Sequence, residues 1–258
     1  NIFIYHKGLR TRSLAEILKD NGYRTSFFQS YKDLGFADTD DFLATMDLDI
    51  VKQMDGEFIT ESDYPYIWGW GLQDNLLYKK HFEYLDKDYI ANQGKTGHVQ
   101  PYFSILSPVS HHYDFSRYPK DQAYIYPNAS TYTQHFANSI HLEDKYLETF
   151  FSELEKRDYL KNSVVVVLGD HSFPSTGVNS DYIYHGFGEN RFRVPFLMVA
   201  PGRITPQRIK LAHSQMDIAP TILDLLDIKA LNHFTGKSIF DNSQEQHCTN
   251  LVQPYDGI

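Results

Sequence analysis

The stretch that decides the fold class is Ser163–Gly177, "SVVVVLGDHSFPSTG". Its residues 164–168 are four valines and a leucine, and a short apolar run of mainly β-branched residues is typical of a buried strand. Gly169 ends the run, and Asp170 and His171 follow it directly. The pattern therefore predicts a central strand that carries an acid and an imidazole at its carboxyl end.

Helical and extended patterns alternate on both sides of this strand. The helix near the start is predicted from Ser13, which suits an N-cap, and Glu16, which completes a capping box. Gly69 and Gly71 form a turn before another helix, while the acidic segment 34–50 is expected to be a solvated loop. The remaining predicted strands are 23–30, 102–106 and 193–202, and the remaining predicted helices are 131–157 and 216–228.

This alternation predicts an α/β layered domain with a mostly parallel central sheet flanked by helices. The 258 residues, 41% of them hydrophobic, suffice for one substantial core, so we expect a single domain over 1–258 in which 203–258 forms a C-terminal helix and tail. The net charge of -9 argues against a nucleic-acid groove. The single cysteine, Cys248, has no second thiol with which to form an internal disulfide.

Polar side chains follow several of the predicted strands. In open α/β sheets, ligands bind beyond the carboxyl ends of the strands, which is where Asp170 with His171 and His111 with His112 are expected. A carboxylate and an imidazole are suitable ligands for zinc or manganese. The alternative for the Asp170–His171 pair is local: the acid caps a turn and the histidine hydrogen-bonds nearby. Two further histidines, His185 and His213, stand before a predicted strand and a predicted helix.

Several stretches in order resemble one protein family. "VVVVLGDHS", "HGFGENRFRVPFLMVAPG" and "HSQMDIAPTILDLLDI" look like the C-terminal half of the sulfatase branch of the alkaline phosphatase superfamily. The resemblance is greatest to the lipoteichoic acid synthase and phosphoglycerol or phosphoethanolamine transferase group, and "SLAEILKDNGYRT", "WGWGLQDNLL" and "SILSPVSHHYDF" extend it over about Ser13–Phe240. It implies an alkaline-phosphatase-like fold and a metal-dependent enzyme.

The resemblance also implies roles for individual residues. Asp170 and His171 match the paired metal ligands, which hold manganese or zinc in the transferases and calcium or magnesium in many sulfatases. His112 matches the histidine that contacts the substrate's anionic group, with His111 as the alternative. His185 resembles a histidine near the transferred group, and His213 lies where some members have a polar residue near the metal, although it also suits a helix start.

Two features of the family are missing from the sequence: a strand that brings an acidic metal ligand, and a helix start that presents the nucleophile. The sulfatase pattern Cys-x-Pro-x-Arg is absent as well. Thr11 and Ser13 precede a helix, where free N–H groups favour an alkoxide or phosphate, but capping is the expected role of Ser13. We therefore expect a fragment whose nucleophile lies upstream of residue 1, with a degenerate relative as the alternative.

For the complete protein, the resemblance implies transfer or hydrolysis of a phosphate-type ester, with phosphoglycerol or phosphoethanolamine passed to an envelope glycan or lipid. The expected location is the periplasmic or extracellular face of a bacterial membrane, with a membrane anchor outside these residues and an anionic lipid or glycan as substrate. One alternative is sulfuric ester hydrolysis. Another is a non-catalytic domain that binds anionic glycans. The 19 tyrosines suit either a sugar-binding surface or an ordinary core.

Overall fold

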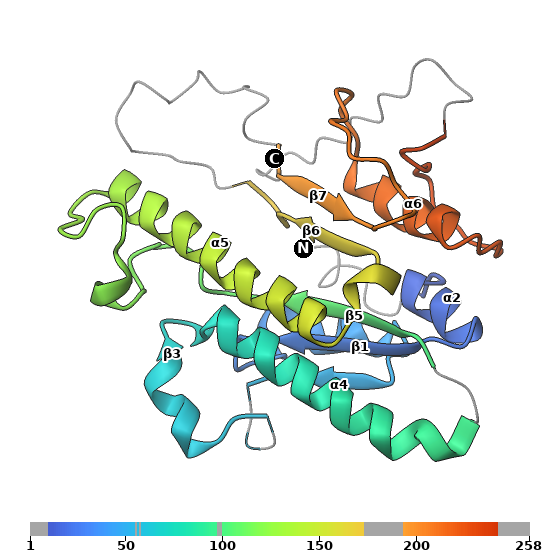
Figure 1. Cartoon of the computed structure of the whole chain (residues 1–258), viewed down its shortest axis with the longest axis horizontal. Coiled ribbons are helices and arrows are strands. Elements are labelled where there is room, and N and C mark those ends of the chain that lie inside the picture. Colours follow the sequence, from blue (N-terminus) through green and yellow to red (C-terminus); the bar gives the residue numbers. More distant parts are fainter. Residues whose placement is uncertain (1–9, 55, 57, 97–99, 173–192, 242–258) are drawn as a thin grey trace. The chain divides into compact units, whose positions relative to one another are not determined.

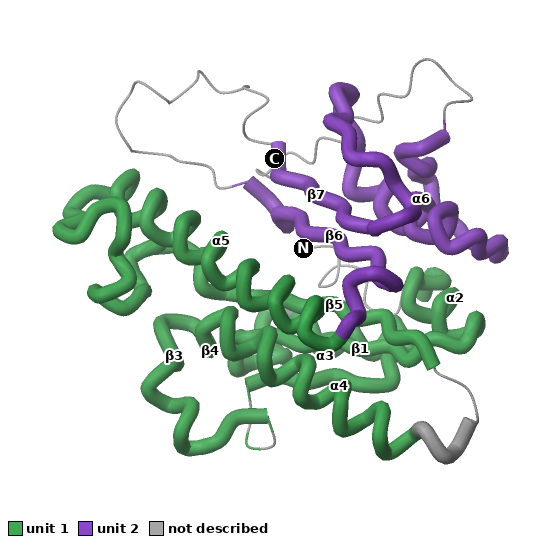
Figure 2. Tube along the Cα trace, viewed as in Figure 1, with its two compact units in different colours: residues 1–157 green, residues 158–258 purple. Residues whose placement is uncertain are grey.

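The structure is a computed structural model that describes residues 10–54, 56, 58–96, 100–172 and 193–241. The chain divides into two compact units, residues 1–157 and 158–258 (Figure 2). The division falls just after the predicted helix 131–157 and before the predicted strand 164–168. The expected single domain over 1–258, with 203–258 as its helix and tail, stays a prediction.

Unit 1 is built on a parallel three-stranded sheet with the strand order β2-β1-β5 (Figure 1). The register pairs Ser26 of β1 with Ile50 of β2 and with Ser104 of β5. This parallel sheet with helices packed on it confirms the α/β expectation. In chain order the helices and strands of unit 1 are α2 (Leu14–Asp20), β1 (Arg24–Gln29), η1 (Phe36–Asp38), α3 (Thr39–Ala44), β2 (Ile50–Lys52), η2 (Glu61–Tyr66), β3 (Ile67–Trp68), β4 (Gly71–Leu72), α4 (Asp74–Thr96), β5 (Tyr102–Ser107), η3 (Lys120–Gln122) and α5 (Tyr132–Lys156).

The core of unit 1 lies between the sheet and the two long helices. Figure 1 shows α4 and α5 side by side in front of the sheet, and their residues share one hydrophobic cluster with those of β1 and β2. Phe28 of β1 and Leu77 of α4 are fully buried, and Leu142 and Tyr146 of α5 are nearly so. These buried residues mark the faces of the two helices that pack in the core of unit 1.

The first helix, α2, begins with the capping box that the sequence predicts. Ser13 Oγ accepts a hydrogen bond from Glu16 N at 3.1 Å, and the Glu16 carboxylate accepts one from Ser13 N at 2.9 Å. This reciprocal capping box satisfies two N–H groups that the helix leaves free. Capping is thus the observed role of Ser13, as expected.

The acidic segment 34–50 differs from the expected loop. It contains α3, and β2 begins at its last residue. Asp40 and Asp41 lie in the first turn of α3, where negative charge is favoured by the helix dipole, and Leu43 is buried. The acidic run therefore stabilises a helix start as well as facing solvent.

Unit 2 contains a two-stranded sheet and a short C-terminal helix. Its elements are η4 (Leu160–Asn162), β6 (Val165–Leu168), β7 (Phe196–Val199), η6 (Gln215–Asp217) and α6 (Ile218–Leu225). Pro220 stands in the first turn of α6, where a missing N–H costs nothing. The pair β6–β7 is antiparallel, with Leu168 opposite Phe196.

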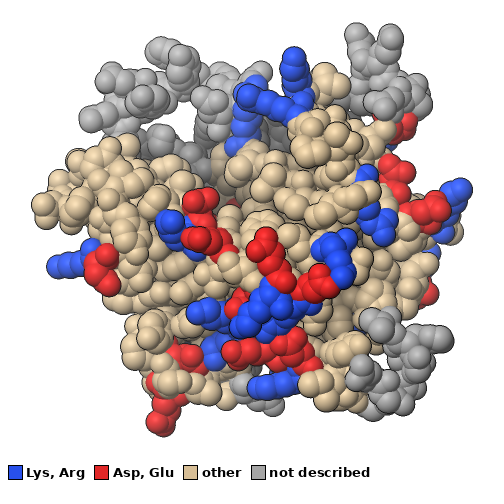
Figure 3. Space-filling view, viewed as in Figure 1, with Lys and Arg blue, Asp and Glu red and all other residues tan. Residues whose placement is uncertain are grey.

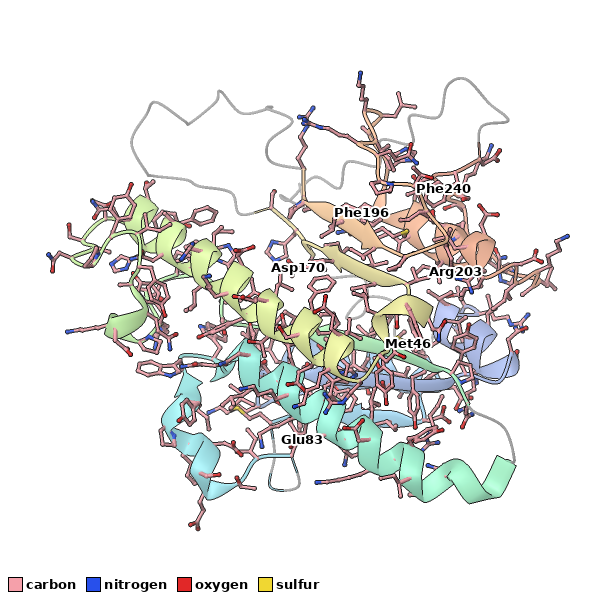
Figure 4. All side chains as sticks on the ribbon, in the orientation of Figure 1. Met46, Glu83, Asp170, Phe196, Arg203 and Phe240 are labelled. Atoms are coloured by element: carbon pink, nitrogen blue, oxygen red, sulfur yellow. The ribbon has the colours of Figure 1, made fainter. Side chains whose placement is uncertain are left out.

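Burial along β6 is less complete than its apolar sequence predicts. Val165 is buried, but Leu168 is 41% exposed, as is its partner Phe196 at 40%. Figure 4 shows Asp170 just beyond the end of β6, beside Phe196 at the start of β7. The carboxyl end of this strand therefore lies at the surface of the described part of unit 2, and so does the polar pair that follows it.

Charged side chains of both signs are interspersed on the face drawn in Figure 3. In unit 1, Arg157 links the two long helices, because Nη2 lies 2.8 Å from Asp86 Oδ2 and the same guanidinium contacts Glu153. Within the described residues, no helix is both long enough and apolar enough to cross a bilayer.

Candidate functional site

The turn after β6 carries the two residues expected to bind a metal. Gly169 N donates to Pro195 O at 3.1 Å, which ties the end of β6 to the segment before β7. A Cβ on Gly169 would lie 3.1 Å from Val194 Cβ, so glycine is the residue that fits this close approach. The chain leaves the strand at this point with the Asp170 and His171 side chains 87% and 61% exposed.

Local hydrogen bonds orient both side chains. Asp170 Oδ1 accepts from His171 N at 2.8 Å, and His171 Nδ1 lies 2.9 Å from Ser172 O. A carbonyl oxygen only accepts, so Nδ1 carries the proton and Nε2 keeps its lone pair. The local alternative, a turn with a nearby hydrogen bond, describes these contacts, but it leaves the other carboxylate oxygen and Nε2 available for a ligand.

Those two available atoms are separated by a distance that suits a shared metal ion. His171 Nε2 lies 3.4 Å from Asp170 Oδ2. Two ligand atoms about 2.1 Å from a tetrahedral zinc ion stand about 3.4 Å apart. The pair therefore fits as half of a zinc- or manganese-type site. Among the described residues, no group of three or more His, Cys, Asp or Glu side chains is placed to hold a metal ion.

A glutamine for which the sequence predicts no role supports the turn after β6. Gln215, the first residue of η6, donates through Nε2 to Gly169 O at 2.9 Å and to Asp170 O at 2.8 Å. One side chain thus fixes the backbone on which the Asp170 carboxylate stands. The quoted "HSQMDIAP" contains this residue, but its partners lie about 45 positions earlier, so only the folded chain reveals its role.

His213, two residues before Gln215, has a local partner. Its Nδ1 lies 3.4 Å from Asp217 Oδ2, and Asp217 also accepts from Ser214 N and Lys237 N at the start of the helical segment. This arrangement is the helix-start role left open for His213. Its proposed contact with substrate stays a prediction. His185 lies outside the described residues, and its role stays a prediction too.

In unit 1, the loop after β5 carries two adjacent histidines with different surroundings. His111 is largely buried between Phe115 and Phe136, with ring centroids 4.9 and 5.0 Å away, and Nδ1 lies 2.7 Å from Ser139 Oγ. Burial lowers the pKa of His111 to about 4, so the ring is neutral at physiological pH. A neutral, packed imidazole suits a role in holding the loop.

His112, in contrast, is exposed. Its Nδ1 lies 2.8 Å from Tyr113 O and therefore carries a proton, which leaves Nε2 free to face a ligand. The ring stacks on Trp70, with the centroids 4.7 Å apart and the planes inclined at 43°. Of the two histidines, His112 is the one whose geometry allows contact with a substrate. The assignment of that contact stays a prediction.

Trp70 was not singled out from the sequence. It belongs to a group of neighbouring rings in which Tyr31 lies 5.7 Å and Phe36 lies 6.3 Å from it. Phe36 is 54% exposed and Trp70 is 37% exposed. Phe28 and Phe82 are core residues, while this group faces solvent. A sugar-binding role for the exposed rings stays a prediction.

Comparisons with known proteins bear on these residues. The family model described as Sulfatase matches residues 5–228. The lipoteichoic acid synthase of Staphylococcus saprophyticus is 28% identical over 172 residues, which is 63% of this chain and 25% of that protein. A lipoteichoic acid synthase-like protein of Bacillus subtilis is 26% identical over 159 residues, 56% of this chain and 25% of that protein.

Solved structures are similar over more of the chain. The lipoteichoic acid synthase LtaP of Listeria monocytogenes has a TM-score of 0.75 and 26% identity, over 92% of this chain and 58% of that one. The C-terminal periplasmic domain of EptC from Escherichia coli has a TM-score of 0.59 at 15% identity, over 83% of this chain and 60% of that one, which is a likeness of fold. This chain spans about a quarter of the length of the two curated relatives.

Proposed function

Because this chain belongs to the sulfatase family, we propose that the natural protein containing it is a metal-dependent enzyme that transfers or hydrolyses phosphate-type esters. The reaction we favour is transfer of phosphoglycerol or phosphoethanolamine to an envelope glycan or lipid. The similarity to proteins named lipoteichoic acid synthases supports a phosphate-type rather than a sulfate-type ester. The same similarity supports a site of action on the outer side of a bacterial membrane, on an anionic lipid or glycan.

The observation that carries the proposal is the 3.4 Å separation of Asp170 Oδ2 and His171 Nε2. These atoms would hold one divalent ion, and oxygen with nitrogen ligands suits manganese or zinc. A bound ion polarises an ester oxygen and lowers the pKa of a hydroxyl nucleophile. Gln215 supports the pair by holding the backbone of Asp170 in place. No residue of the described ranges is assigned as the nucleophile.

The second proposed role belongs to His112, in the loop of unit 1 that follows β5. With Nδ1–H donating to Tyr113 O, a second proton on Nε2 turns the ring into a cation that donates to a phosphoryl oxygen. The face of Trp70 stabilises such a cation through its ring quadrupole. His112 would thus neutralise charge on the anionic group while the tyrosine carbonyl fixes the orientation of the ring.

Turnover of two substrates by the full-length natural protein tests this function. We expect release of the head group from fluorescent phosphatidylglycerol in vesicles and little hydrolysis of 4-nitrophenyl sulfate. His112→Gln should lower kcat/KM for the lipid on the order of 100-fold, because one charge-stabilising donor is lost. His233→Gln, at an exposed histidine of unit 2, is the matched control. Equal kcat/KM in the two variants, or turnover of the sulfate ester alone, would contradict the proposal.

A further inference from the structure

A pair of acids beneath the His112 loop has no part in the function proposed above. Asp74 is the first residue of α4, and its side chain is fully buried. Its Oδ1 accepts from Val109 N at 2.9 Å, and its Oδ2 accepts from Ser110 N at 2.9 Å. Ser110 Oγ accepts in turn from Asp74 N at 3.1 Å. A buried carboxylate thus holds two consecutive N–H groups of the loop that follows β5.

These contacts reach His112 by one further hydrogen bond. His112 N donates to Val109 O at 3.1 Å, so the peptide groups around Val109 are fixed on both sides. Trp70, the ring that contacts His112, lies four positions before Asp74. Its turn packs closely against the loop that follows β5. A Cβ on Gly71 would lie 2.9 Å from Val109 Cγ1 and 2.4 Å from Ser30 O. The Asp74 carboxylate is therefore tied to both partners of the stack.

The second acid, Glu143 of α5, meets Asp74 from the neighbouring helix. Glu143 Oε1 accepts from Tyr78 OH at 3.0 Å, and its side chain is hydrogen-bonded to Asp74. The other oxygen, Oε2, is buried and has no donor among the described residues. A protonated Glu143 resolves this, because its O–H then donates to the Asp74 carboxylate. Burial and the charge of Asp74 raise the pKa of Glu143 well above its ordinary value.

We propose that Asp74, backed by Glu143 as its proton-bearing partner, is the positioning residue that keeps His112 stacked on Trp70. Asp74 touches no substrate in this account. It sets the loop geometry from which His112 acts, so the inference rests on the substrate-contact role proposed for His112. The alternative is that Asp74 only stabilises the start of α4. Its replacement would then lower the stability of the fold and leave the contact between His112 and Trp70 unaltered.

Tryptophan fluorescence separates these two roles without any substrate. Trp68 and Trp70 are the only tryptophans in the chain, so Trp68→Phe leaves Trp70 as the sole reporter. An imidazole in contact with an indole quenches its emission, so at a fixed pH Trp70 should be quenched in this background. His112→Gln should abolish that quench, which establishes that the signal reports the stack.

In the same background, Asp74→Asn replaces one acceptor oxygen by an amide that cannot accept from the loop. Loss of a buried charged hydrogen bond should lower the equilibrium constant for the stacked arrangement about tenfold, so most of the quench disappears. Glu143→Gln keeps a neutral donor toward Asp74 and should retain the quench of the parent. Asp144→Asn, at the exposed neighbour on α5, is the matched control.

A quench in Asp74→Asn equal to that of the parent would overturn the proposal. If Asp74→Asn fails to fold by circular dichroism, Ser110→Ala removes the contacts of the Ser110 hydroxyl with Asp74 and should reduce the quench partly. An unchanged quench there would also overturn the proposal. Turnover of the phosphatidylglycerol probe by the full-length protein keeps the two proposals apart. Loss of the quench with an unchanged KM would keep Asp74 as the positioning residue and reject the substrate role of His112.

Discussion

The buried acid pair predicts an unusual dependence of stability on pH. Burial and the charge of Asp74 raise the pKa of Glu143 in the folded chain well above its ordinary value of 4.5, which favours the protonated form. The unfolded chain releases that proton above about pH 4.5. Between these two pKa values the folded state binds one more proton than the unfolded state, so the free energy of unfolding falls as pH rises, by about 1.4 kcal/mol per pH unit.

Comparison with Glu143→Gln isolates this contribution. Burial lowers the pKa values of His81 and His111 to about 3 and about 4, and the parent and the variant share both groups. Glu143→Gln has no proton to lose at this position, while it keeps hydrogen bonds to Tyr78 and Asp74. We therefore expect the parent to lose stability relative to the variant as pH rises above about 4.5, by at most about 1.4 kcal/mol per pH unit.

Urea unfolding followed by tryptophan fluorescence measures this slope, because both tryptophans lie in unit 1 with the acid pair. The control Asp144→Asn should keep the slope of the parent. A Glu143→Gln variant that loses stability with pH as steeply as the parent would refute the assignment of the proton to Glu143. So would a difference in stability between the two proteins that does not change with pH above about 4.5.

Three further predictions follow from particular contacts. His81 is buried, and neither of its ring nitrogens has a hydrogen-bond partner within the described residues. Because burial lowers its pKa to about 3, the parent loses stability as pH falls from about 6.5 toward 3. His81→Leu should therefore be more stable than the parent by about 2 kcal/mol at pH 5 in urea titrations, and equal acid sensitivity of the two proteins would count against this. Gly71→Ala should lower the free energy of unfolding at pH 7 by about 1–3 kcal/mol in urea titrations, because the new Cβ would lie 2.4 Å from Ser30 O. A loss under about 0.5 kcal/mol would show that the loop shifts to accommodate the methyl group. Gln215→Leu should weaken manganese binding by the full-length protein about tenfold in calorimetric titrations, because the Asp170 backbone loses its support; unchanged affinity would remove Gln215 from the account.

The parts of the fold that local chemistry dictates could be predicted from the sequence. The capping pair Ser13 and Glu16, the valines before Gly169 and the periodicity of 131–157 each act over a few residues, and each element formed where it was expected. The acidic segment 34–50 was misjudged because its charges suit a helix start as well as a loop. The antiparallel pairing of β6 with β7 depends on how the chain between them returns, which periodicity does not encode.

The sequence predicts which residue types belong to the candidate site, but not how their side chains are arranged. His111 and His112 are neighbours with the same chemistry, and only long-range contacts distinguish them. Ser139 lies 28 positions after His111, and Trp70 lies 42 positions before His112. Asp74 and Glu143 gave no signal in the sequence, because isolated acids on helices are usually solvated. Their meaning comes from burial and from one another.

The central claim is that Asp170 and His171 hold a divalent metal ion, and metal analysis of the purified full-length protein tests it most directly. After equilibration with manganese or zinc and removal of free metal, we expect bound metal in the parent and in Asp158→Asn, an exposed acid of the same unit. Asp170→Asn and His171→Ala should each lose most of that metal, since each removes one of the two ligands placed 3.4 Å apart. Equal metal content in all four proteins would contradict the account.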